Sequence, residues 1–501
     1  MEAPHRVDSG DLAVLPHLAG EYRRRRPQET VLYQVVQENY RTFVNLREEE
    51  GRPLPGFVRR EFEKFLACGD LAEGFLRLYC QGCGYDRLVA FSCKCRGWCP
   101  SCVGRRMNDG AAFLTDRLIG DTPIRQWVLS LPHPLRYLLA YDSAILGEVV
   151  GAFVAAVFQH LRWKAKELLG LRSVSLAHPG AVTVVQRCSG DLSLNSHLHS
   201  LITDGVFVED RAERTVTFHA LPPPTDGEVA DVAWETCRRT CSILVRHGRW
   251  KDDLDEPGEE DAAPEGMADL YAASLRGVLV FGTRRGQRAV RFFGQAAPRW
   301  SEEPRPRPPG AFDVHARQAV HAGDRAAVER LARYVLRPPL SGGRLERRDD
   351  GLVAITLKRA WRDGTAGVLL EPLELVGRLA ALVPQPRTNT IRFHGVYAAH
   401  ARLRKLVVPA GEPEKKSCPC AKERPVRRDG HLAWAELLAR VFEADVFRCP
   451  RCNAHGMQRI ATIVDHDVVR RILRAVGLPT EPPVPHPPRS AEDLFHETRL
   501  A

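Results

Sequence analysis

The sequence predicts an α+β protein in which an antiparallel sheet carries helices on one face and follows a cysteine-rich metal-binding module. Strands are expected where β-branched and apolar residues run together, at residues 124–131, 181–187 and 214–219 and in the stretch through His197. A long amphipathic helix is expected at residues 142–169. Strands and a helix in this order are typical of an antiparallel sheet covered by helices.

The composition is that of a large, basic, globular protein. The chain has 501 residues, of which 44% are hydrophobic, enough to bury two or three cores. Lysine and arginine number 72 against 62 acidic residues, and the net charge of +10 suits a polyanionic partner without requiring one. The N-terminus lacks a secretory signal pattern, and the most apolar run, residues 144–158, is interrupted by Glu148. We therefore expect a cytoplasmic protein with no membrane partner.

The cysteines predict a structural metal site. Seven of the fourteen lie between residues 68 and 102. Two residues separate Cys80 from Cys83 and Cys99 from Cys102, and fifteen residues lie between the two pairs. This spacing predicts one tetrahedral Zn²⁺ site with four thiolate ligands. A disulfide framework is less suited to a large chain without a signal.

A second candidate metal site lies on the strand that contains His197, Leu198 and His199. Residues 189–191 form the turn that precedes this strand. Successive side chains of a strand point to opposite faces, so the two imidazoles project together while Leu198 anchors the other face. Two imidazoles on one rigid strand form a ready pair of ligands for a divalent cation.

Residues 324–340 predict a helix that begins at an aspartate N-cap and ends before two prolines. Its buried stripe consists of residues at helical spacing, namely Val328, Leu331 and Val335. Tyr334 lies off this stripe, and Arg330 and Arg337 lie four residues before it and three after it on nearly the same face. Such a tyrosine between two guanidinium groups is placed to meet a phosphate. An amphipathic surface tyrosine is the alternative.

The remaining segments divide the chain further. Two acidic, proline-bearing stretches, residues 251–266 and 301–311, are expected to be linkers or insertions. Cys449 and Cys452 supply half of a second zinc site, for which Cys418 with Cys420, or His455, are the candidate partners.

Four segments resemble the transposases of rolling-circle insertion sequences of the IS-ninety-one type, which are HUH nucleases. The segments are the histidine strand, RYVLRPPLSGGRL from Arg333 onward, LACGDLAEGFLRLYCQGC followed by FSCKCRGWCPSC, and FHGVYAAHARLRKLVVP. The similarity extends from about residue 28 to about residue 478, in the same order throughout. It implies a protein of the bacterial nucleoid whose partner is DNA, as single-stranded transposon ends and target.

The resemblance implies a fold and a domain order. The nuclease core would be a ferredoxin-like or RRM-like antiparallel sheet of HUH type, with the histidines on a central strand and the tyrosine on a helix across from them. The expected order is an N-terminal tail (1–27), a helical and zinc-binding domain (28–115), the HUH core (120–345), a basic α/β DNA-binding extension (346–410), a linker (411–430), a C-terminal helical module with a CxxC pair (431–478) and a disordered tail (479–501).

The resemblance also implies a chemistry, in which a divalent cation and a tyrosine act together on the scissile phosphate. It assigns His197 and His199 to a catalytic Mg²⁺ or Mn²⁺ ion and Tyr334 to the nucleophile. Arg330 and Arg337 would offset the charge of the phosphate. A third ligand is expected from the chain, either Gln186 on the preceding strand or His315.

Family members with two catalytic tyrosines carry them four residues apart. The residue four before Tyr334 is Arg330, so the chain resembles the single-tyrosine branch. Cys68 and Cys93 fall where the family has cysteines and are expected in a second or alternative zinc ligand set, whereas Cys95 is an extra. Arg105 and Arg106 are candidates for contact with the DNA backbone.

Two other classes of protein remain as alternatives. A replication initiator or relaxase would share the tyrosine chemistry but not the zinc module. A non-enzymatic zinc-containing DNA-binding protein would keep the cysteine pairs and form no covalent adduct with DNA.

Overall fold

The computed structural model describes residues 25–210, 213–249, 263–282, 284–294, 312–408, 437, 446–454 and 456–489. Most of the two expected linkers, and the whole of the linker at 411–430, lie outside these ranges.

A six-stranded antiparallel sheet forms the centre of the molecule. Its strand order is β10 (Asp313–His315), β3 (Ile124–Ser130), β6 (Leu194–Thr203), β5 (Gly180–Cys188) and β15 (Ile391–Gly395), and β11 (Ala319–Val320) also pairs with β3. The histidine strand is β6, which lies between β3 and β5 and is therefore central, as expected.

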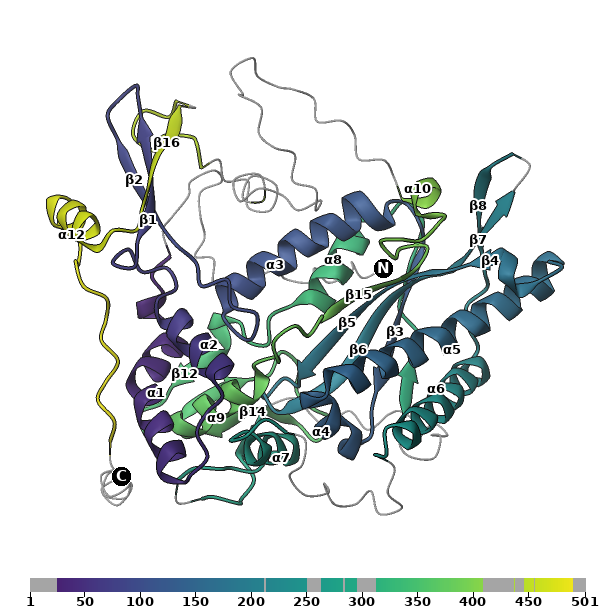
Figure 1. The fold of residues 1–501 in the computed structure, drawn as a ribbon, viewed down its shortest axis with the longest axis horizontal. Helices are drawn as coiled ribbons and strands as arrows, with labels where there is room; N and C mark the ends of the chain where they lie inside the picture. Colours follow the sequence, from purple (N-terminus) through teal and green to yellow (C-terminus); the bar gives the residue numbers. More distant parts are fainter. Residues whose placement is uncertain are drawn as a thin grey trace.

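Helices cover both faces of this sheet, so the expectation of helices on one face is wrong (Figure 1). One face packs on α4 (His133–Tyr141), α5 (Ser143–Leu169) and α6 (Asp226–Arg246). The other face packs on α3 (Pro100–Phe113), the π-helical η2 (Leu114–Ile119) and α8 (Arg325–Leu336). The strands are apolar on both faces, and a strand buried on both faces needs two covering layers.

Helix α5 begins where the Asp142 carboxylate accepts hydrogen bonds from the backbone N–H groups of Ala144 and Ile145, and it ends at the left-handed Gly170. Among the described residues it is the helix long and apolar enough to cross a membrane. Of its most apolar 18-residue window, 61% is buried inside the protein, as expected for a helix that packs on a sheet.

The strand expected at 214–219 does not join the central sheet. It is β8 (Thr215–Ala220), which pairs with β7 (Gly205–Asp210) in a separate three-stranded sheet completed by β4 (Ala177–His178). Strand β15 occupies the edge beside β5 instead. The alternating pattern of β8 identified a strand but not its partner.

A second unit lies beside the central sheet. Its four-stranded sheet has the order β12 (Leu345–Arg347), β13 (Val353–Thr356), β14 (Thr365–Leu370) and β9 (Val290–Phe293). The unit shares one hydrophobic core with α1 (Val31–Glu49), α2 (Gly56–Leu66), α7 (Ala268–Arg276) and α9 (Pro372–Leu382). The described residues also form the short helices η1 (Pro27–Glu29), η3 (Val174–Leu176), η4 (Gly342–Arg344) and α10 (Arg404–Val407).

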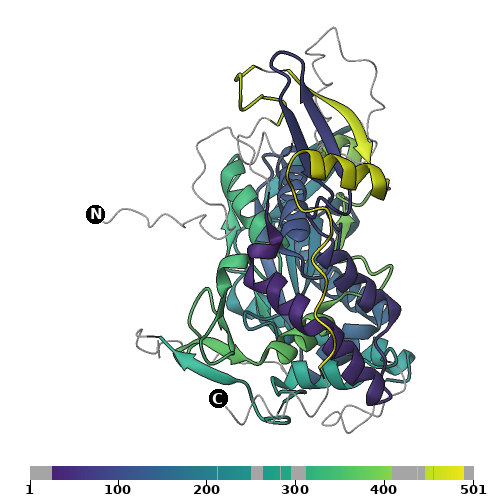
Figure 2. The same ribbon diagram turned by 90° about the vertical axis from the view of Figure 1, so that its left-hand side faces the viewer.

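A hairpin from the N-terminal part of the chain and a strand from the C-terminal part form a small sheet. Strands β1 (Phe75–Cys80) and β2 (Asp86–Ala90) form a hairpin, and β16 (Met457–Ile463) pairs with the outer side of β1 (Figure 2). Helix α12 (His466–Ala475) follows β16. Residues 479–489 belong to the tail expected to be disordered, yet they lie along α1, where Gln37 donates to the Val484 carbonyl and His486 N donates to the Gln37 carbonyl.

Candidate functional site

Helix α8 places Tyr334 against the histidine pair of β6. The ring centroids of His197 and His199 lie 5.0 Å apart, and those of His199 and Tyr334 lie 5.7 Å apart with perpendicular ring planes. Tyr334 is 44% exposed, so its ring contacts the histidine while the side chain stays accessible. The structure therefore brings together three side chains that the sequence places in two distant segments.

The local fold explains why both histidines face α8. Leu198 between them is fully buried in the core formed with α5, on the opposite face of the sheet. The Asp324 carboxylate accepts from the Ala327 N–H and starts α8, while Val335 and Leu331 pack on the sheet. Because Leu331 and Val335 face the sheet, Tyr334 lies at the border of this apolar stripe.

Burial favours the neutral form of both imidazoles. Burial, with smaller contributions from His197 and Arg337, lowers the pKa of His199 to about 3. Burial also lowers the pKa of His197, although its bond to Asn195 acts in the opposite direction. A neutral imidazole keeps the lone pair that a metal ligand needs.

Hydrogen bonds orient the two rings differently. Nδ1 of His197 lies 2.7 Å from the Asn195 carbonyl oxygen and donates to it, which leaves Nε2 with the lone pair. Nδ1 of His199 lies 2.7 Å from the side-chain amide of Gln126, and its Nε2 is buried without a hydrogen-bond partner among the described residues. The sequence analysis missed Gln126, although it lies in the predicted strand 124–131.

The two candidates for the third ligand lie in different settings. Gln186 pairs in register with His197, and its Nε2 donates to the Val335 carbonyl at 2.7 Å, so it also holds α8 to β5. His315 lies on the edge strand β10, where its Nε2 is 3.1 Å from the Asp313 carboxylate. Among the described residues no third histidine, cysteine or carboxylate gathers with His197 and His199. The geometry therefore favours the amide over His315.

The two expected arginines differ in their relation to the tyrosine. The guanidinium carbon of Arg337 lies 4.6 Å from the centroid of the Tyr334 ring, which is a cation–π contact. Arg330 is exposed on the same helix, one turn before Tyr334. Arg337 is thus the positive charge next to the tyrosine, and Arg330 is free to meet a ligand from solvent.

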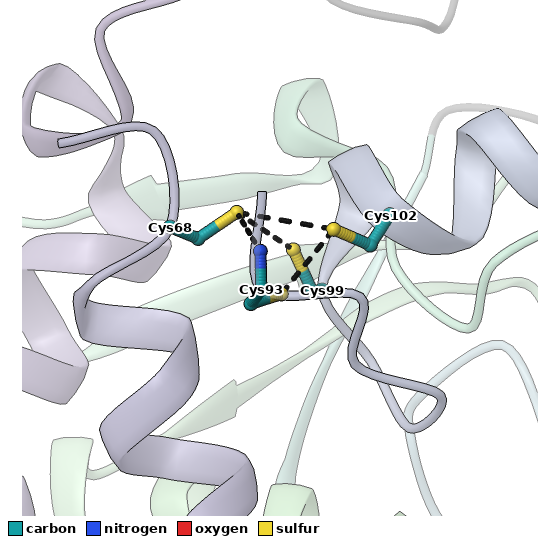
Figure 3. Close-up of side chains that lie close together, drawn as sticks. All are labelled: Cys68, Cys93, Cys99 and Cys102. Atoms are coloured by element: carbon teal, nitrogen blue, oxygen red, sulfur yellow. Dashed lines mark hydrogen bonds between the residues drawn. The ribbon is translucent and has the colours of Figure 1, made fainter. Parts of the chain in front are cut away.

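The cysteines form two clusters, which confirm Cys68 and Cys93 as members of an alternative ligand set and Cys449 with Cys452 as half of a second one. Cys68, Cys93, Cys99 and Cys102 form the first cluster (Figure 3). The second consists of Cys80, Cys83, Cys449 and Cys452. The prediction that the two N-terminal CxxC pairs share one ion is therefore wrong. Cys418, Cys420 and His455, the expected partners of Cys449 and Cys452, lie outside the described residues.

The β1–β2 hairpin explains this division. Cys80 and Cys83 lie at its tip, whereas Cys93, Cys99 and Cys102 follow its base. A strand of five or six residues spans about 17–20 Å at about 3.3 Å per residue. This length is too great for one tetrahedron of thiolates, so the tip needs other partners.

Both clusters fit a zinc ion. Four thiolates at about 2.3 Å from Zn²⁺ lie about 3.8 Å from one another. The sulfur of Cys68 lies 3.9 Å from those of Cys99 and Cys102, and the sulfurs of Cys93 and Cys102 lie 3.3 Å apart. The backbone N–H of Cys93 donates to the Cys68 sulfur at 3.3 Å, which is the kind of bond that stabilises a thiolate ligand. Cys95 lies outside both clusters, as expected.

Arg106 is a structural residue of the first cluster. Its guanidinium donates to the backbone carbonyls of Lys94 and Cys95 and so holds the loop that carries Cys93. The expectation that it contacts DNA is therefore not favoured. Arg105 is exposed on α3.

Comparisons with known proteins show the family to which the chain is similar. The family model "Transposase zinc-binding domain" matches residues 35–131, and the model "Putative transposase" matches residues 180–405. The transposase for insertion sequence element IS801 from Pseudomonas savastanoi pv. phaseolicola is 23% identical over 399 residues, which cover 78% of this chain and 80% of that protein. No solved structure matches the chain.

The two domain matches define a transposase with an N-terminal zinc-binding domain. The chain belongs to the IS-ninety-one-type transposases of insertion sequences, as the resemblance implied.

Proposed function

We propose that this transposase cleaves and rejoins single-stranded DNA at the ends of its element through a covalent bond to Tyr334. The observation that carries the proposal is the position of Tyr334 on α8, with its ring 5.7 Å from that of His199 on the central strand. A nucleophile and a pair of neutral metal-binding imidazoles on facing elements are what HUH-type chemistry requires. We accordingly propose that residues 120–345 form an HUH-type core.

In the first step the Tyr334 oxygen attacks the scissile phosphorus in line, and its proton passes to solvent. The bond from phosphorus to the tyrosine oxygen forms as the bond to the 3′ oxygen breaks, and that oxygen takes a proton to become a 3′-OH. In the second step a 3′-OH attacks the phosphotyrosine and loses its proton, the bond from phosphorus to the tyrosine oxygen breaks, and Tyr334 regains a proton as the phosphodiester is restored. The tyrosine ester retains the bond energy, so rejoining needs no ATP.

His197 and His199 would hold a Mg²⁺ or Mn²⁺ ion, and Gln186 is the proposed third ligand. An amide that donates through its nitrogen to Val335 keeps its oxygen for a hard cation. The ion would supply Lewis-acid polarisation of a phosphate oxygen. Arg337 beside the tyrosine and Arg330 one turn away would offset phosphate charge.

The proposal is tested with labelled single-stranded element ends. The wild-type protein with Mn²⁺ or Mg²⁺ is expected to give a complex that survives denaturation. H197A and H199A should abolish this complex and leave DNA binding largely intact, and a chelator should reproduce the loss reversibly. Cleavage by the H197A/H199A double variant would contradict the assignment. A protein that binds the DNA but never forms the complex would be the non-enzymatic alternative.

A further inference from the structure

The second cysteine cluster joins two parts of the chain that are far apart in sequence. Cys83 and Cys449 are separated by 366 positions, yet their sulfurs lie 3.5 Å apart. The sulfurs of Cys80 and Cys452 lie 3.6 Å apart. These distances match a zinc tetrathiolate as closely as those of the first cluster do.

We infer that a zinc ion shared by Cys80, Cys83, Cys449 and Cys452 clasps residues 446–489 to the N-terminal zinc-binding domain. The zinc-binding family model ends at residue 131 and the transposase model at residue 405, so neither includes Cys449 or Cys452. The clasp would make the C-terminal segment a part of the N-terminal domain. This inference does not depend on the proposed tyrosine chemistry.

The contacts around the cluster come from both parts of the chain. Strand β16 pairs with β1 along its length, from Phe75 opposite Ile463 to Cys80 opposite Met457. Arg87, which is buried, donates to the Val446 carbonyl at 3.0 Å. The segment before β16 is therefore positioned by β2 on the N-terminal side.

The apolar cores that join the two parts are small. One consists of Leu71, Ala72, Phe75, Ile463, Val469 and Leu473, and the other of Leu78, Cys80, Val89, Cys449 and Met457. Units with so little buried apolar surface need a disulfide or a structural metal to remain folded. Two cysteines of the second core are themselves cluster ligands, so the ion and the core form together.

Beyond α12 the chain returns along α1 (Figures 1 and 2). Arg489 N donates to the Thr42 hydroxyl at 3.0 Å, and His486 N donates to the Gln37 carbonyl at 3.1 Å. These few hydrogen bonds, of which the one to the buried Thr42 is partly shielded from solvent, contribute little without an apolar core beside them. We therefore expect the segment to leave the N-terminal domain when the ion is lost.

The test uses the full chain with a specific protease site inserted in residues 411–430. After cleavage the wild-type C-terminal piece should coelute with the remainder in size-exclusion chromatography, with about two zinc ions per chain. In C449S/C452S the zinc content should fall to about one ion per chain and the cut piece should elute separately. The matched control is C237S/C241S, a pair on α6 outside both clusters, which should leave zinc content and coelution unchanged.

C449H separates loss of the ion from loss of the fold, because histidine can replace one thiolate as a zinc ligand. Coelution and about two zinc ions per chain in C449H, with both lost in C449S, would support the clasp. Coelution of the cut piece in C449S/C452S, or about one zinc ion per chain in the wild type, would overturn it. If C449S/C452S does not fold, the comparison of C449H with C449S decides.

Discussion

At the scale of single residues, the side-chain amide of Gln126 lies where it can set which ring nitrogen of His199 carries the proton. The amide nitrogen of Gln126 lies 2.7 Å from Nδ1 of His199. Nε2 of His199 can bind a cation only if Nδ1 carries the proton, and the Gln126 amide must then flip so that its oxygen accepts from Nδ1. Such partners of a ligating histidine fix the ring and its tautomer.

We predict that Q126L weakens Mn²⁺ binding at this site by about 10–100-fold, as measured by isothermal titration. Q126E, which keeps an acceptor next to Nδ1, should restore most of the affinity. The matched control is Q159L, at an exposed glutamine of α5. Unchanged Mn²⁺ affinity in Q126L would show that the amide does not orient His199.

At the scale of elements, a buried ion pair attaches α1 to α7. The guanidinium of Arg47 is fully buried and donates to both carboxylate oxygens of Asp269, at 2.6 and 2.8 Å, and to the Gly266 carbonyl. Arg52 contacts the same carboxylate at 3.2 Å but is 46% exposed.

R47A should lower the free energy of unfolding of the unit that contains α1 and α7 by about 3–5 kcal/mol, because it leaves the partly buried Asp269 without its main partner. R52A, which removes an exposed partner of the same carboxylate, should cost about 0–1 kcal/mol. Urea denaturation followed by circular dichroism measures both. Equal effects of the two substitutions would mean that burial does not decide the strength of the pair.

Local sequence patterns predicted the single elements well. The expected helix at 142–169 is α5 (Ser143–Leu169), and the expected N-cap Asp324 does begin α8. The pairing of β8 and the second layer of helices were not predicted. Periodicity shows which side of an element is buried but not which element covers it.

At the scale of the whole molecule, both candidate sites depend on contacts between distant segments. The sequence pattern indicated His197, His199 and Tyr334 as candidate site residues. Only the family resemblance implied that these residues lie close together. The grouping of the cysteines could not be predicted, because CxxC spacing defines only a pair of ligands. It does not give the length of the hairpin that separates Cys80 from Cys99. Nor does it give the strand pairing that brings Cys449 to Cys80.

The central claim is that Tyr334 is the nucleophile, and substitution of this tyrosine by phenylalanine tests it. Y334F keeps the ring against His199 and beneath Arg337 but removes the attacking oxygen. We predict that wild-type protein forms a denaturant-stable complex with labelled single-stranded element ends in Mn²⁺, whereas Y334F binds the same DNA and forms none. A covalent complex in Y334F, or a DNA-linked peptide from the wild type that maps to another tyrosine, would contradict the account.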